Sequence, residues 1–248
     1  MNTETSGLNF IAIWSQGDAI SHAVAVALLV MSLASWSIIL GKAWMTWNLR
    51  HRTPRALETF WNSGDLESGL EALERLPLFH DMARQGQGAI RHLEAHHRES
   101  RQGAAHLDAR LSASELVTRA LRNSISRTRA RLEGGLTLLA SVGSTAPFIG
   151  LFGTVWGIYH ALARIGATGQ SSLSQVAGPV GEALVMTAAG LFVAIPAVLA
   201  YNAFSRSLAL ITADMEAFAY DLHAYFTTGN PLSLVQGSDR RPAIREAV

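Results

Sequence analysis

The 248-residue chain is 49% hydrophobic and 16% charged, whereas about 25% of the residues in a typical soluble domain are charged. Its net charge is +1 and it has no cysteine. The composition therefore gives no reason to expect a nucleic-acid partner, and it excludes disulfides, thiol catalysis and cysteine-bound metals. The shortage of charge is local, which indicates membrane spans joined by polar segments.

The first apolar run predicts one membrane-spanning helix over residues 22–44, because roughly 20 mostly apolar residues cross a bilayer. Residues 1–21 contain no Lys or Arg. Four basic residues follow the apolar run closely: Lys42, Arg50, Arg52 and Arg55. Since basic residues stay on the cytoplasmic side, we expect residues 1–21 to lie outside and this helix to run inward.

Residues 45–133 form a polar region that we expect to be a cytoplasmic helical domain. Fifteen of the 20 Lys and Arg residues fall between Lys42 and Glu133. Thr53-Pro54 predicts a helix start, because Thr is a good N-cap and Pro suits the first helical position. A short helix is expected over Leu66–Leu73, ended by Pro77, and another over Met82–His97.

The last part of this region predicts a helix that enters the membrane. No helix breaker lies between Ala104 and the Gly134-Gly135 pair, so we expect one long helix that continues into a second span at residues 134–163. A loop at 164–175 and a third span at 176–204 follow. The apolar spacing beyond the third span alternates four and three, which extends that helix over 205–228. The tail, 229–248, is expected to be mobile.

These elements predict an all-α membrane protein with three transmembrane helices. The second and third helices are expected to extend into a cytoplasmic helical bundle. Small residues form a stripe on the second span at four-three-four spacing: Ala146, Gly150, Gly153 and Gly157. Such stripes let helix backbones approach closely. Pro147 and Pro196 each remove a backbone donor and should bend their helices.

Three polar residues in the spans are candidates for a proton pathway. Thr154 and Thr187 lie about 7 Å and about 5 Å above the span centres, so we expect the two hydroxyls at nearly one level on antiparallel helices. The alternative is that each hydroxyl bonds its own i−4 carbonyl. Glu182 is the only acidic residue in a span. It lies about 12 Å from the centre, and structural and proton-handling roles are both open.

Other chemistry has little support in the sequence. His92 and His96 are four apart on an expected helix, but with no third convincing ligand a solvated helix face is the better interpretation. GLFGTVWG has neither phosphate-loop spacing nor a Lys. No catalytic arrangement recurs at informative spacing, so we expect no enzyme, metal or cofactor.

Two segments carry a resemblance to a known family. APFIGLFGTVWGI at Ala146–Ile158 and GPVGEALVMTAAGLFVAIPAVLAYN at Gly178–Asn202 resemble the ExbB/TolQ branch of the MotA/TolQ/ExbB proton-channel family. By motif position, Thr154 and Thr187 correspond to pore-lining threonines of that family, and Glu182 corresponds to the family's Glu in the third span.

The resemblance implies a bacterial inner-membrane protein with a periplasmic amino terminus and a cytoplasmic carboxyl terminus. It implies a homopentamer around a smaller, ExbD-like single-span subunit that carries a membrane Asp. With a TonB-like protein, such a complex uses the proton motive force to power outer-membrane import of iron complexes and similar nutrients. The segment VAGPVGEALVMTA favours ExbB over TolQ. A TolQ-like subunit of the Tol-Pal envelope-maintenance system, or a non-conducting scaffold, is the alternative.

Overall fold

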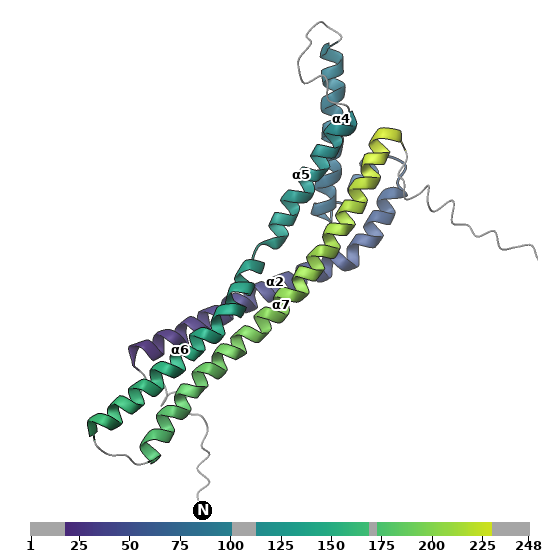
Figure 1. Cartoon of the computed structure of the whole chain (residues 1–248). Helices are drawn as coiled ribbons and strands as arrows, with labels where there is room; N and C mark the ends of the chain where they lie inside the picture. Colours follow the sequence, from purple (N-terminus) through teal and green to yellow (C-terminus); the bar gives the residue numbers. More distant parts are fainter. Residues whose placement is uncertain (1–17, 101–112, 169–172, 230–248) are drawn as a thin grey trace, which may run out of the picture. The chain divides into compact units, whose positions relative to one another are not determined.

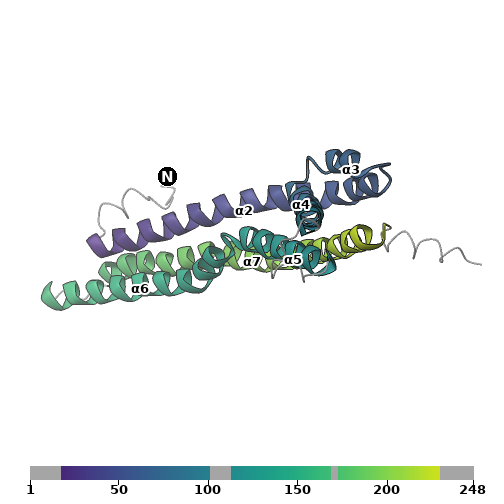
Figure 2. The same ribbon diagram turned by 90° about the horizontal axis from the view of Figure 1, so that it is seen from above.

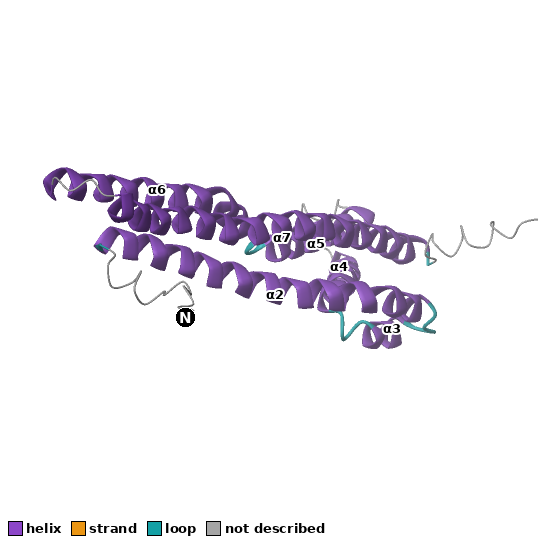
Figure 3. Ribbon diagram, turned by 90° about the horizontal axis from the view of Figure 1, so that it is seen from below, coloured by secondary structure: helices purple, strands orange, loops and turns teal. Residues whose placement is uncertain are grey.

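The computed structural model describes residues 18–100, 113–168 and 173–229, and within these ranges its regular elements are α-helices, without a strand (Figures 1 and 3). The helices are α2 (Ala19–Trp61), α3 (Leu66–Ala72), α4 (Pro77–Ser100), α5 (Ala113–Glu133), α6 (Leu136–Thr168) and α7 (Leu173–Thr228). Three of the helical stretches are long and apolar enough to cross a membrane. The predicted all-α class with three such helices is confirmed.

The chain divides into two compact units. The apolar unit comprises Met1–Trp44 and Gly135–Ser205, and the polar unit comprises Met45–Gly134 and Arg206–Val248. The apolar unit thus holds the first part of α2, all of α6 and most of α7. In it, α6 and α7 run antiparallel side by side (Figure 2). Helix α2 contacts α6, where Val24 lies against Gly153.

The polar unit has a well-packed hydrophobic core. Its largest fully buried apolar side chains come from four segments of the chain: Leu73, Phe79, Met82, Val117, Met215 and Leu222. The rings of Phe60 and Phe79 lie edge-on to Phe218, with centroids 5.3 Å and 5.5 Å away. Aromatic pairs favour this geometry. The apolar seam predicted beyond the third span is therefore the α7 contribution to this core.

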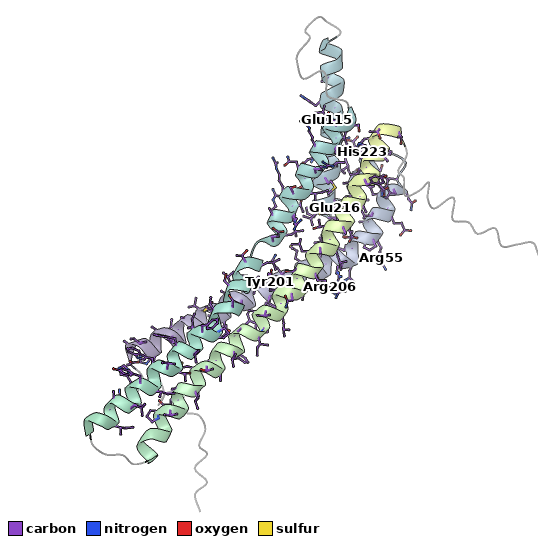
Figure 4. The ribbon with its side chains drawn as sticks, viewed as in Figure 1. Arg55, Glu115, Tyr201, Arg206, Glu216 and His223 are labelled. Atoms are coloured by element: carbon purple, nitrogen blue, oxygen red, sulfur yellow. The ribbon has the colours of Figure 1, made fainter. Side chains whose placement is uncertain are left out.

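One end of the polar unit joins α5 to α7 through a polar contact. Ser114 Oγ lies 2.9 Å from His223 Nε2. Figure 4 shows His223 of α7 and Glu115, the neighbour of Ser114, at this same end of the unit. The predicted end of the long helix is also found, since α7 ends at Thr228 and Gly229 follows with a φ of 83°. Glycine adopts this left-handed conformation without the strain of a Cβ, and it commonly terminates helices.

The predicted helix start at Thr53-Pro54 is wrong. Helix α2 runs through this position with Pro54 inside it. The Thr53 hydroxyl donates to Leu49 O at 2.8 Å, so it bonds within the helix instead of capping one. Pro54 has no N–H, so one bond of the helical ladder is missing here, and neighbouring packing outweighs that loss.

Helix α4 is longer than predicted, and a cap that the sequence analysis did not identify precedes it. Pro77 begins α4 instead of only ending the segment before it, and the helix continues to Ser100. Asp65 is the N-cap of α3, and its side chain accepts the Ser68 N–H at 2.8 Å. Hydrogen bonds from the Ser68 side chain and backbone hold the pKa of Asp65 below its usual value.

The single helix predicted from Ala104 into the membrane is interrupted. Helix α5 ends at Glu133 and α6 begins at Leu136. Gly135 between them has a φ of 82°, which a residue with a Cβ rarely adopts. Helices α6 and α7 also extend into the loop predicted at 164–175, leaving 169–172 outside the described residues. Most of the predicted segments 1–21 and 229–248 lie outside them too.

Candidate functional site

Helices α6 and α7 of the apolar unit approach each other closely enough to exclude side chains. A Cβ on Gly150 would lie 2.6 Å from Met186 O and 3.0 Å from the Gly190 Cα. A Cβ on Gly190 would lie 2.6 Å from Ala146 O. Real side chains do not occupy such distances, so the two backbones touch at these glycines. This close approach brings the polar side chains one turn further along into contact.

Thr154 is the centre of a hydrogen-bond cluster between α6 and α7. Its side chain is buried, and its Oγ1 lies 2.9 Å from Ala183 O on α7 and 3.2 Å from Gly150 O on its own helix. Its Oγ1 also forms a hydrogen bond with Thr187 Oγ1. A hydroxyl has one proton to donate and can accept as well. Thr154 can therefore donate to a carbonyl while accepting from Thr187.

The alternative of two hydroxyls each bonded to its own i−4 carbonyl is not the arrangement found. The i−4 carbonyl of Thr187 is that of Ala183, and Thr154 reaches across from α6 to bond it. The bond from Thr154 to its own i−4 carbonyl at Gly150 is the longer of the two. Thr154 is buried, whereas Thr187 is half-buried, so Thr187 is the more accessible member of the pair.

Glu182 is not part of this cluster. Its side chain is half-buried. It makes no hydrogen bond or ion pair with any residue that the structure describes, although its neighbour Ala183 supplies the carbonyl that Thr154 bonds. The structure therefore brings Thr154 and Thr187 together, whereas Glu182 bonds neither of them.

The small-residue stripe packs helices within one chain. Gly153 faces Val24 of α2 and Met186 of α7, and a Cβ on Gly157 would lie 2.9 Å from the Ala183 Cβ. Ala146 is fully buried. Within one chain the stripe therefore contacts α7 and α2. A role for the stripe in joining subunits stays a prediction. Pro147 and Pro196 lie inside α6 and α7, which continue past them.

One polar contact was not identified from the sequence. Asp18 lies just before α2, and its Oδ2 accepts a hydrogen bond from Trp156 Nε1 at 2.6 Å. Its Oδ1 accepts the Ser21 N–H at 2.9 Å, which is an N-cap bond. The cap could have been found from the spacing of Asp18 and Ser21. The contact with Trp156 could not, because 138 positions separate the partners.

No group of three His, Cys, Asp or Glu side chains that could hold a metal ion occurs among the residues that the structure describes. His92 lies on α4, and the side chain of His96 is outside the description. The chemistry available at the Thr154–Thr187 cluster is therefore hydrogen bonding and proton exchange between hydroxyl groups.

Comparison with known proteins gives consistent matches. The family model for the MotA/TolQ/ExbB proton channel family matches residues 91–217. The chain is 44% identical to the biopolymer transport protein ExbB of Xanthomonas campestris pv. campestris (strain B100) over 217 residues, 87% of this chain and 85% of that one. It is 40% identical to ExbB of Neisseria meningitidis serogroup A, covering 87% and 96%. Its identity to the Tol-Pal system protein TolQ of Haemophilus influenzae is 34%, covering 86% and 92%.

Proposed function

The chain belongs to the MotA/TolQ/ExbB proton channel family, and from this membership we propose that Thr154 and Thr187 form the proton-handling site of an ExbB-type subunit. The subunit works in a bacterial inner-membrane complex that uses the proton motive force to power outer-membrane import of iron complexes and similar nutrients. The observation that carries the proposal is the hydrogen bond between the two hydroxyls, on two helices that touch.

The pair handles protons through the different exposure of its members. Thr187 is half-buried and meets the group that exchanges a proton with the pair. Thr154 is held in place by its bond to the Ala183 carbonyl. A hydroxyl that donates and accepts at once can pass a proton without carrying charge. Moving one charge through 100 mV supplies about 2.3 kcal/mol, whereas one hydrogen bond has a net value of about 1 kcal/mol. Proton passage can therefore rearrange this cluster.

The titrating carboxylate comes from a partner. Glu182 is the one acidic residue in the predicted spans, and it does not contact the threonines. We propose that an ExbD-like single-span subunit supplies a membrane Asp next to Thr187, and that a TonB-like protein receives the work. This assignment predicts that the chain alone conducts few protons.

A homopentamer is proposed as the housing for that partner. In the most apolar 18-residue stretch of α2, only 17% is buried within the chain. The corresponding share in α7 is 28%. The remaining apolar surface must face lipid or other subunits, because it cannot face water at the observed extent. Exposed side chains on α6 include Phe148, Leu151 and Phe152.

A TolQ-like role in envelope maintenance is the second candidate. The TolQ relative is 34% identical, against 40% and 44% for the ExbB relatives. This difference favours the ExbB-type role. Deleting the gene and scoring growth on chelated iron against sensitivity to detergent separates the two: the ExbB-type role predicts lost iron-dependent growth with an intact envelope.

The proton-handling proposal is tested by replacing the Thr187 hydroxyl. Thr187→Val keeps the shape and deletes the hydroxyl, and Thr187→Ser keeps the hydroxyl. In membranes that hold the complete complex, we expect Val to reduce proton flux and iron-complex uptake by roughly tenfold or more, the effect of one hydrogen bond to a charged group, and Ser to retain most of both. Wild-type flux in Thr187→Val would reject the proposal and leave a non-conducting packing role.

A further inference from the structure

We propose that Asp18, Trp156 and His160 form a clasp that holds the amino-terminal end of α2 on α6, positions the helix that carries Thr154, and tightens when His160 is protonated. Asp18 uses both carboxylate oxygens: Oδ1 accepts the Ser21 N–H, and Oδ2 accepts Trp156 Nε1 at 2.6 Å. His160 Nε2 lies 3.9 Å from the same Oδ2. The inference extends the proposed function, since Trp156 lies two residues beyond Thr154.

A cap alone does not account for this geometry. An N-cap needs one acceptor oxygen, and the Ser21 N–H already uses one. The second oxygen bonds an indole on another helix at 2.6 Å, which is shorter than an ordinary N–H···O bond, as expected when the acceptor is charged. Asp18→Ser therefore separates the capping role from the clasp. Serine is also a good N-cap, but its side chain is too short to reach Trp156 and carries no charge.

His160 supplies the part of the clasp that responds to protonation. At 3.9 Å its Nε2 does not form a hydrogen bond with Asp18, but a protonated ring would form an ion pair there. The ring of Trp156 lies beside it, with centroids 4.5 Å apart, and an aromatic face favours a cation. His160 Nδ1 is buried and has no hydrogen-bond partner in the described structure, so the ring has no contact that competes with the one to Asp18.

The charge on Asp18 is constant across the relevant pH range. A hydrogen bond from the Ser21 side chain, followed by those from Trp156 and the Ser21 backbone, lowers the pKa of Asp18 to about 2 despite some burial. The carboxylate is thus ionised throughout the range in which an ordinary imidazole gains its proton, about pH 6.5. A protonated His160 would place a positive charge opposite this fixed negative charge, so protonation tightens the clasp.

Other titratable or charged side chains are carried by the same parts of the helices. They are Tyr159 and Arg164 on α6, His22 on α2 and Glu182 on α7. The ring of Tyr159 lies edge-on to His160, with centroids 5.4 Å apart. Replacing His160 and Asp18 individually distinguishes their contribution to the pH response from any contribution of these four groups.

The absence of native cysteine allows the clasp to be measured directly. Spin labels at Ala19→Cys on α2 and Leu162→Cys on α6, both exposed positions, report the distance between the two helices. Labelled chains are diluted with unlabelled chains in membranes that hold the complete complex, so that distances within one chain dominate. Distances are recorded at about pH 8 and about pH 5, on either side of the ordinary His pKa.

The wild-type distance distribution should narrow at the lower pH. Asp18→Ser and Trp156→Phe should broaden it at both pH values, whereas Asp18→Asn, which still accepts from Trp156, should broaden it little but remove the pH response. His160→Gln should also remove the pH response. Proton flux should fall by roughly tenfold in Asp18→Ser, the effect of losing one charged hydrogen bond, and Asp18→Asn should retain most of it.

Each failure contradicts a defined part of the proposal. Unchanged distances in Asp18→Ser and Trp156→Phe would reject the clasp. A wild-type distribution that is independent of pH, or a response that persists in His160→Gln, would reject the role of His160. Broadened distances with wild-type flux would reject the positioning role. The distance results do not depend on whether Thr187 handles protons, so failure of the clasp and failure of the proposed function remain distinguishable.

Discussion

The two threonines at the α6–α7 contact have different roles in the structure. Thr154 is buried and bonds a carbonyl of the facing helix, whereas Thr187 is half-buried and bonds only Thr154 among the described residues. Removing one hydroxyl therefore has a different physical consequence from removing the other. The sequence motif alone treats them as equivalent pore-lining residues.

This asymmetry predicts different stability for the two Val variants. Thr154→Val removes the inter-helix bonds to the Ala183 carbonyl and to Thr187 and should lower the free energy of unfolding by about 1–3 kcal/mol, the net value of two hydrogen bonds. Thr187→Val leaves the bond to the Ala183 carbonyl intact and should change stability by under about 1 kcal/mol. Thermal unfolding of the purified complex in detergent provides the measurement. Equal destabilisation of both variants would contradict the assigned bond.

At the scale of the elements, glycines determine how α6 meets α7 and where α5 ends. Gly150 and Gly190 let the two backbones touch, and this contact sets the spacing of the neighbouring hydroxyls. Gly135 ends the helical run with a positive φ, and a Cβ there would also lie 3.2 Å from Ile38. Both effects arise from the missing Cβ, although one concerns packing and the other concerns backbone conformation.

Gly150→Ala should separate α6 from α7. Its Cβ would lie 2.6 Å from a backbone oxygen, which cannot move aside as a flexible side chain can. We expect a loss of about 1–3 kcal/mol in unfolding free energy, as in other overpacked sites, together with reduced proton flux.

Gly181→Ala is the matched control, because a Cβ on Gly181 meets nothing within 4 Å among the residues that the structure describes. It should leave stability unchanged or slightly higher, since Ala is the better helix former. Denaturation curves of the two variants test this. A Gly150→Ala protein as stable as Gly181→Ala would show that the helices are further apart than described.

At the scale of the whole molecule, the arrangement of charge predicts orientation. Fifteen of 20 basic residues lie between Lys42 and Glu133, and basic segments remain cytoplasmic. We therefore propose that this region and the carboxyl-terminal tail are cytoplasmic and that the amino-terminal segment is periplasmic. The three candidate spans found among the described residues agree with this, because an odd number of spans places the termini on opposite sides.

Single cysteines at Ser6, Gly169 and Gln236 test the orientation in the naturally cysteine-free chain. A membrane-impermeant thiol reagent added to cells with a permeable outer membrane should label positions 6 and 169 and leave 236 unlabelled. Lysed membranes serve as the control, in which all three should react. Labelling of position 236 alone in intact cells would reverse the proposed orientation.

The sequence by itself determined the all-α class and the three helices that are long and apolar enough to cross a membrane, and it identified Thr154 and Thr187 as candidate residues. Apolar length and the four-three spacing depend only on local chemistry, and they predicted the end of α7 at Thr228 correctly. The sequence could not determine that α2 continues through Pro54, because packing outweighs a local penalty there. The prediction of one continuous helix through Gly135 was also wrong, because glycine permits the left-handed backbone without requiring it.

Tertiary structure alone decided which polar groups meet. Depth along the spans placed Thr154 and Thr187 at one level, but only the packing of α6 on α7 established that Thr154 bonds the carbonyl of Ala183. The same packing showed that the glycine stripe is covered within the chain, and it joined Asp18 to Trp156 across 138 positions. Side-chain hydrogen bonds depend on ångström-scale distances between helices, and those distances follow from the joint packing of all three helices rather than from any one segment.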